Sequence, residues 1–184
     1  MVAYRDRSDE EIRDIYIARK TGDTWETSYS VHNDGWKIAG CPVNGPMLSI
    51  RSNQIAIAWY TAANDEAKVN VAFSDDLGKT FSNPIRVNSG MPLGRVDLDW
   101  INDSEVLVSW IESSELSSNI VVRKIKNDLT MRDKIVIAEV SKGRISGYPQ
   151  METHKDQILF SWTEIGTETS VASKWIPISK IVNN

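Results

Sequence analysis

The sequence predicts an all-β repeat protein, and more specifically three to four blades of a β-propeller. Three observations predict this fold class: a tryptophan that recurs about every 50 residues, short strand patterns around each copy, and the lack of helical periodicity. The chain has 184 residues, of which 41% are apolar and 25% are charged. These values are ordinary for a domain with a buried core.

The repeat is centred on Trp59, Trp110 and Trp162, each of which closes an alternating apolar segment. The second of these tryptophans follows the first by 51 residues, and the third follows the second by 52. Tyr4 takes the tryptophan position in a fourth copy, 55 residues before Trp59. A period of about 50 residues filled with short strands is typical of a four-stranded propeller blade.

Apolar and polar residues alternate in a way that places strands inside each copy. The expected strands are 2–5, 14–19 and 27–31 in the first copy, 46–50, 54–60, 68–74 and 84–88 in the second, 95–101, 105–111, 119–125 and 134–139 in the third, and 148–153, 157–163 and 170–176 in the last. The blades are therefore expected at 1–31 (partial), 46–88, 95–139 and 147–176 (partial).

A turn motif follows the third expected strand of the second copy, at 74–81. It fits the pattern S-x-D-x-G-x-T-[FW] through Ser74, Asp76, Gly78, Thr80 and Phe81. Serine and aspartate side chains can bond to turn amides, and a glycine can take positive φ. A degenerate copy at 18–25 keeps the glycine, threonine and aromatic residue but lacks the serine and the aspartate.

Together with the tryptophan period, this motif resembles the Asp-box (BNR) repeat of bacterial exo-α-sialidase-like β-propellers. The segments 4–7, 34–46 and 146–149 extend the resemblance, and the chain is similar over nearly its whole length to the second half of such proteins. The resemblance implies part of a six-bladed ring. It also implies an exported or periplasmic protein, although the N-terminus has no signal-peptide pattern.

In a propeller, the loops between second and third strands and the connections between blades share one face, opposite the Asp-box turns. The Asp-box residues are therefore expected to be structural. Sialidase chemistry needs arginines for the substrate carboxylate, a carboxylic acid and an activated tyrosine. The candidate catalytic residues on this face are Asp6, Asp9, Tyr148, Glu112 and Glu164. The candidate ligand-binding residues are Arg5, Arg7, Trp36, Arg95 and Arg144.

Two of these assignments have a structural alternative. Glu112 and Glu164 occupy the same repeat position, which suggests an architectural role. Trp36 is expected either to stack on a sugar ring or to pack over the gap between blades.

Composition excludes several classes of function. The net charge is −4 and no basic stripe is present, so we expect no nucleic-acid partner. Cys41 is the one cysteine, and His32 and His154 lie far apart, so no disulfide, metal or cofactor is expected. No apolar run approaches the ~20 residues of a membrane span.

Three functions remain open. The chain is either a non-catalytic propeller module that binds glycan or protein, an exo-α-sialidase that acts on sialylated glycans, or a structural fragment of a larger propeller. A partial ring exposes apolar blade faces, so we expect a homodimer or a complex with another propeller half.

Overall fold

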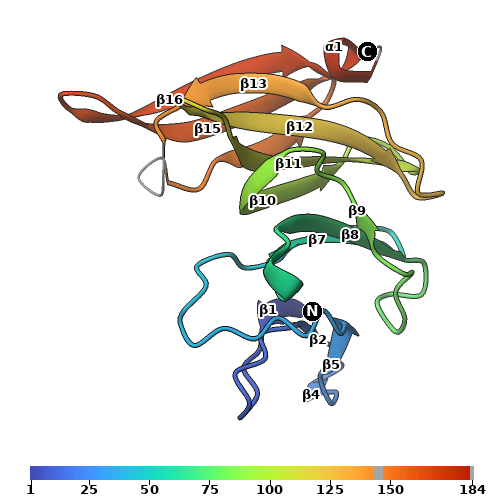
Figure 1. The fold of residues 1–184 in the computed structure, drawn as a ribbon. Helices are drawn as coiled ribbons and strands as arrows, with labels where there is room; N and C mark the ends of the chain where they lie inside the picture. Colours follow the sequence, from blue (N-terminus) through green and yellow to red (C-terminus); the bar gives the residue numbers. More distant parts are fainter. Residues whose placement is uncertain (143–146, 183–184) are drawn as a thin grey trace.

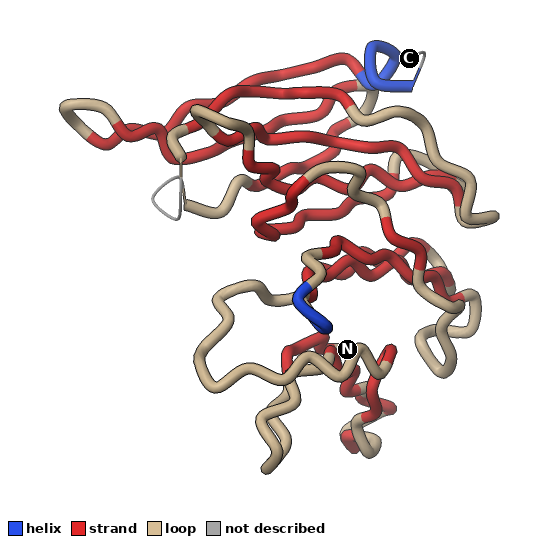
Figure 2. The backbone as a smooth tube through the Cα atoms, in the orientation of Figure 1, coloured by secondary structure: helices blue, strands red, loops and turns tan. Residues whose placement is uncertain are grey.

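The structure is a computed structural model that describes residues 1–142 and 147–182, so Arg144 lies outside the described residues. Nearly all of its regular structure is β, as Figure 2 shows. The strands form three- and four-stranded antiparallel sheets that follow one another along the chain (Figure 1). The predicted all-β, propeller-type architecture is confirmed.

The first sheet has the order β1 (Val2–Arg5), β2 (Ile15–Ala18), β5 (Tyr29–His32). A small hairpin of β3 (Lys20–Thr21) and β4 (Thr24–Trp25) projects between the last two of these strands. This hairpin is the degenerate turn copy.

The second and third sheets are four-stranded meanders in chain order. The second contains β6 (Met47–Arg51), β7 (Gln54–Thr61), β8 (Lys68–Ser74) and β9 (Ile85–Arg86), and the third contains β10 (Met91–Trp100), β11 (Glu105–Ser113), β12 (Ser118–Lys126) and β13 (Ile135–Val140). The fourth sheet contains β14 (Gln150–His154), β15 (Gln157–Ile165) and β16 (Thr169–Pro177), and the short helix α1 (Ile178–Val182) follows it.

Each sheet buries apolar side chains on both faces where it lies between two others, because alternate residues of a strand point to opposite sides. Ile57 and Trp59 of β7 pack with Ile15 and Ile17 of the first sheet. Ala56 lies on the opposite face of β7. The residues of this face pack against the third sheet. The third and fourth sheets meet in the same way through a separate apolar cluster. The core is thus divided among the gaps between sheets, as in a propeller.

The three repeat tryptophans are each the sixth residue of their strand. They lie opposite Asn70, Val121 and Ala172 on the following strand, and all three pack toward the preceding sheet. Tyr4 pairs in the same way with Tyr16. The sequence period therefore marks equivalent positions in successive sheets.

The turn at 74–81 has the hydrogen bonds that its sequence favours. Ser74 Oγ accepts from the amide of Gly78 at 2.9 Å. The Asp76 carboxylate accepts from the amides of Lys79 and Thr80 at 2.9 and 3.0 Å and from the Thr80 hydroxyl at 2.8 Å. Gly78 has φ = 70°. The motif closes the turn between β8 and β9.

Three local features differ from the sequence expectation. A 3-10 turn at 63–65 and helix α1 were not anticipated, since both are too short to leave a periodic pattern. Strand β10 begins at Met91 rather than at 95, and its register shifts twice between Pro92 and Asp97. In the part of the chain that the structure describes, no helix is long and apolar enough to cross a membrane.

Candidate functional site

The inner strands β6, β10 and β14 all begin at the same face, and the connection 33–46 crosses this face before β6. Asn44 in that connection joins several elements. Its carbonyl accepts from Arg5 Nε at 2.8 Å, and its side-chain Oδ1 accepts from the Arg95 amide at 2.9 Å. Its Nδ2 donates to the carbonyl of Leu93 at 3.2 Å. Asn44 therefore ties the first sheet to the start of β10.

The start of β10 has an unusual backbone that this asparagine stabilises. Gly94 has φ = 84° and Arg95 has φ = 56°, both in the left-handed region. A Cβ on Gly94 would lie 2.5 Å from Asn44 Oδ1, so only glycine fits there. The resulting bulge buries the Arg95 side chain, which is 6% exposed.

Arg95 on β10 and Tyr148, two residues before β14, lie together. The Arg95 guanidinium carbon is 5.2 Å from the centroid of the Tyr148 ring, and its Nη1 donates to the carbonyl of Gly147. The Tyr148 hydroxyl donates to the carbonyl of Val43. The connection 33–46 thus touches both residues.

Arg5 lies on the other side of the same connection. Besides Asn44, its guanidinium donates to the carbonyls of Arg13 and Tyr60, and it lies 4.9 Å from the ring centroid of Trp36. Burial lowers the pKa of Arg5 to about 10. Because its donors are directed at main-chain carbonyls, Arg5 holds this face together.

A cavity of about 250 Å³ opens between these groups, here called the central cavity. Its lining includes Trp36, Val43, Tyr60, Leu93 and Arg95. Trp36 is 7% exposed and contacts Tyr60 edge to face, with ring centroids 5.6 Å apart. The volume is below the ~300–1,000 Å³ of drug-sized ligand sites, so it suits a single small ring.

Three of the sequence-predicted residues lie on the loop between β1 and β2. Arg7 is exposed and pairs with Glu11 in the same loop. The amide of Asp6 donates to the carbonyl of Asp14 at 2.9 Å, and Asp9 is exposed. The described lining of the central cavity includes none of these three residues.

The two glutamates at one repeat position have different surroundings. Glu112 is buried, and it accepts from the Trp110 indole at 3.1 Å, from the Gly90 amide at 3.3 Å and from Lys134. Glu164 is exposed. Lys134 precedes the fourth strand of the third sheet, and the fourth sheet has α1 in place of such a strand. The architectural role therefore fits Glu112 but does not extend to Glu164.

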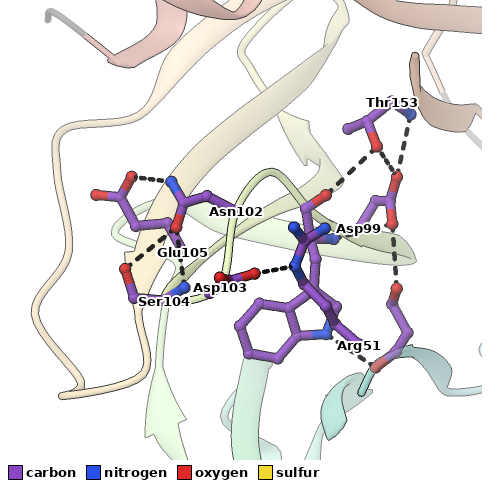
Figure 3. Close-up of polar contacts among 9 residues, drawn as sticks. Arg51, Asp99, Asn102, Asp103, Ser104, Glu105 and Thr153 are labelled. Atoms are coloured by element: carbon purple, nitrogen blue, oxygen red, sulfur yellow. Dashed lines mark hydrogen bonds and ion pairs between the residues drawn. The ribbon is translucent and has the colours of Figure 1, made fainter. Parts of the chain in front are cut away.

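The sequence did not predict a role for two aspartates of the inner strand β10, because no recognisable motif surrounds them. Asp97 accepts from the amides of Leu98 and Met151 at 2.8 and 2.6 Å. Asp99 accepts from the Thr153 amide at 3.0 Å and from its hydroxyl, as Figure 3 shows. These two carboxylates fasten β10 to β14.

The same aspartates differ in their surroundings. Burial raises the pKa of Asp97 to about 6. Asp99 also accepts from Ser49 on β6 at 3.1 Å, so it connects three inner strands. Among residues 1–142 and 147–182, no group of three or more His, Cys, Asp or Glu side chains is arranged to hold a metal ion.

No protein-family model matches the sequence, and no curated protein sequence matches it. Solved structures do match. A thermostable family-43 glycoside hydrolase superposes with a TM-score of 0.56 at 14% identity, over 94% of this chain and 67% of the other. An α-L-arabinofuranosidase from Clostridium thermocellum gives 0.53 at 18% identity, over 92% and 59%. A Hadza microbial sialidase gives 0.55 at 15% identity, over 92% and 40%.

The chain therefore has a propeller fold of the glycoside-hydrolase type. It spans 67%, 59% and 40% of the lengths of these three proteins. At such identities the likeness concerns the fold, and function depends on the site.

Proposed function

We propose that the chain is a sialidase-like, Asp-box β-propeller module that binds a single carbohydrate ring in the central cavity and does not hydrolyse it. One observation carries the distinction between binding and catalysis. The Tyr148 hydroxyl donates to the carbonyl of Val43, whereas an attacking tyrosine needs a carboxylate partner. Glu112, a candidate catalytic carboxylate, bonds instead to Trp110, Gly90 and Lys134.

The cavity itself supports sugar binding. Its lining combines two aromatic residues, Trp36 and Tyr60, with a charged residue, Arg95. Aromatic surface combined with a few polar groups is the usual composition of a small-ligand site. The glycoside hydrolases that share the fold make a carbohydrate the first ligand class to test.

The test combines a glycan array with calorimetry on the best glycan. Arg95→Gln should weaken binding at least about tenfold, which corresponds to ~1.4 kcal/mol. Arg7→Ala, which removes an exposed arginine of the first loop, should leave the affinity within about twofold. An empty array, or equal losses for both variants, would contradict the proposal.

Exo-α-sialidase activity is the second candidate, since Arg95 and Tyr148 are two of the residue types that this chemistry needs and they lie in contact. Release of fluorophore from a sialoside, abolished by Tyr148→Phe, would establish it. A structural fragment of a larger propeller is the third candidate. Failure of both the array and the sialoside assay would favour it.

A further inference from the structure

A second cavity, here called the rim notch, lies between the first and second sheets. Its volume is about 430 Å³, and its lining includes His32, Asp34, Asn70 and Lys68. None of these side chains lines the central cavity. The rim notch is therefore a separate polar cavity.

Asp34 presents a fixed carboxylate to the rim notch. Its side chain is 6% exposed, and its Oδ2 accepts from the Trp59 indole at 2.6 Å. Its other oxygen, Oδ1, accepts a long hydrogen bond from Asn70 Nδ2 at 3.5 Å and lies 3.9 Å from His32 Nε2. Burial raises the pKa of Asp34, so hydroxyl donors on Oδ1 would offset the cost of its desolvation.

Asn70 is a buried polar residue at a position that is apolar in the later repeats. It lies opposite Trp59, where Val121 lies opposite Trp110 and Ala172 opposite Trp162. Asn70 is 7% exposed. Burying an amide costs free energy unless it is hydrogen-bonded, and its Nδ2 contact with Asp34 is at the long limit of a hydrogen bond.

The charges of the rim notch favour a neutral ligand over an anion. Glu66 forms ion pairs with Lys68 at 2.8 Å and with Arg86 at 2.5 Å, so one carboxylate pairs with both cations. The remaining polar groups of the lining are a carboxylate, asparagine amides, a threonine hydroxyl and an imidazole, which together donate and accept. Each hydroxyl of a sugar also donates and accepts.

We infer that the rim notch is a second binding site, for a neutral sugar whose hydroxyls donate to Asp34 Oδ1 and bond to the amide of Asn70. The site does not depend on the central cavity. Asp34 is held by Trp59, and the next residue, Gly35, donates its amide to Asp14 at 2.9 Å. The acceptor is therefore preorganised before the ligand arrives.

The experiment is an NMR titration of the ¹⁵N-labelled full chain with L-arabinose, D-galactose and D-glucose, and separately with inorganic phosphate. The indole N–H of Trp59 reports on the rim notch, because it bonds directly to Asp34. The indole N–H of Trp36 reports on the central cavity. We expect at least one sugar to shift the Trp59 signal with a Kd of roughly 1–10 mM, and phosphate to leave it unchanged.

Two variants complete the test. Asn70→Val installs the residue type of the third sheet, and it should keep the fold while weakening the sugar-dependent Trp59 shift at least about fivefold. Glu168→Gln, at an exposed position directly before β16, should leave that shift unchanged. No Trp59 shift with any sugar, a shift with phosphate instead, or an undiminished shift in Asn70→Val would each overturn the inference. The Trp36 signal is judged separately, so a failure of the central site leaves this outcome readable.

Discussion

The Arg95 guanidinium lies 5.2 Å from the centre of the Tyr148 ring, so a cation–π contact joins the starts of two consecutive inner strands. Both residues also reach the connection 33–46, Arg95 through its amide to Asn44 and Tyr148 through its hydroxyl to Val43. This pair is the centre of the proposed binding face. Substitutions can separate the contribution of the Tyr148 hydroxyl from that of its ring.

Tyr148→Phe removes the hydroxyl but keeps the ring beside Arg95. We expect the free energy of unfolding to fall by about 1 kcal/mol, the value of one hydrogen bond, and sugar affinity to stay within about twofold. Tyr148→Ala removes the ring as well and should cost about 1 kcal/mol more and weaken binding. Chemical denaturation and calorimetry measure both. Loss of binding in the phenylalanine variant would show that the hydroxyl itself contacts the ligand.

Gly94→Ala tests the bulge at the start of β10. The φ of 84° and the 2.5 Å approach of the new Cβ to Asn44 Oδ1 should together destabilise the protein by roughly 2–4 kcal/mol. Asn44→Ala alone should cost about 1–3 kcal/mol, because it loses hydrogen bonds to Leu93 and Arg95.

The double variant is the control for this prediction. It relieves the steric clash but leaves the strained φ, so its total cost should be smaller than the sum of the single costs. Simple additivity, measured by urea unfolding, would mean that the clash contributes nothing.

The order of strands could be predicted from the sequence because the repeat is local. Trp59, Trp110 and Trp162 end alternating apolar segments, and the spacing of these segments predicts where each sheet lies in the chain. The sequence motif of the turn at 74–81 predicts the hydrogen bonds of that turn.

The site was harder to predict because its contacts join distant segments. Asn44 contacts Arg5 across 39 residues and Arg95 across 51, and no spacing rule points to it. Asp97 and Asp99 looked like ordinary strand residues, since their partners lie on another sheet. Two of the three repeat tryptophans carry one usable signal: Trp59 and Trp110 both donate an indole N–H to a buried carboxylate.

The ionised Asp76 carboxylate should stabilise the protein, and protonation of this group in acid should remove that contribution. Its pKa is depressed mainly by the backbone hydrogen bond from Thr80, with further bonds from Ser74 and the Thr80 hydroxyl. A carboxyl with a depressed folded-state pKa stabilises the protein above its unfolded pKa of about 3.9, and this stability is lost as the pH falls below that value.

Asp76→Asn should therefore lower Tm at pH 7 and reduce the difference in Tm between pH 7 and pH 3. Asp75→Asn is the matched control, because it changes the neighbouring aspartate and leaves the Asp76 bonds in place. Equal thermal shifts for the two variants would contradict the role of Asp76.

Asp97 should have the opposite effect to Asp76 on the pH dependence of the free energy of unfolding, and this effect should occur at higher pH. Burial raises its folded-state pKa to about 6, so the folded protein takes up a proton between about pH 6 and pH 4 where the unfolded chain does not. The contribution of this group to stability is thus largest below pH 4 and is lost as the pH rises through 6. Relative to Asp97→Asn, the wild-type protein should lose about 2 kcal/mol of unfolding free energy between pH 4.5 and pH 7. A pH-independent difference between the two proteins in denaturant titrations would exclude this titration.

We expect self-association through the outer faces of the first and last sheets. Tyr4 and Tyr16 lie 6.1 Å apart, on the side of the first sheet that points away from Ile15 and Ile17. On the last sheet, Leu159 pairs with Trp175 and Thr163 with Val171, on the side that points away from Phe160.

Val171 is 78% exposed and Trp175 is 55% exposed. Burying both side chains against a second copy would remove apolar surface from water, which favours association. We expect light scattering to give twice the monomer mass at about 100 μM, with the first sheet of each copy against the last sheet of the other. Val171→Lys should shift the equilibrium to monomer. Val136→Lys, on the outer strand of the third sheet, should not, although Val136 is also 55% exposed. A wild-type monomer at this concentration would instead favour another propeller half as the partner of these faces.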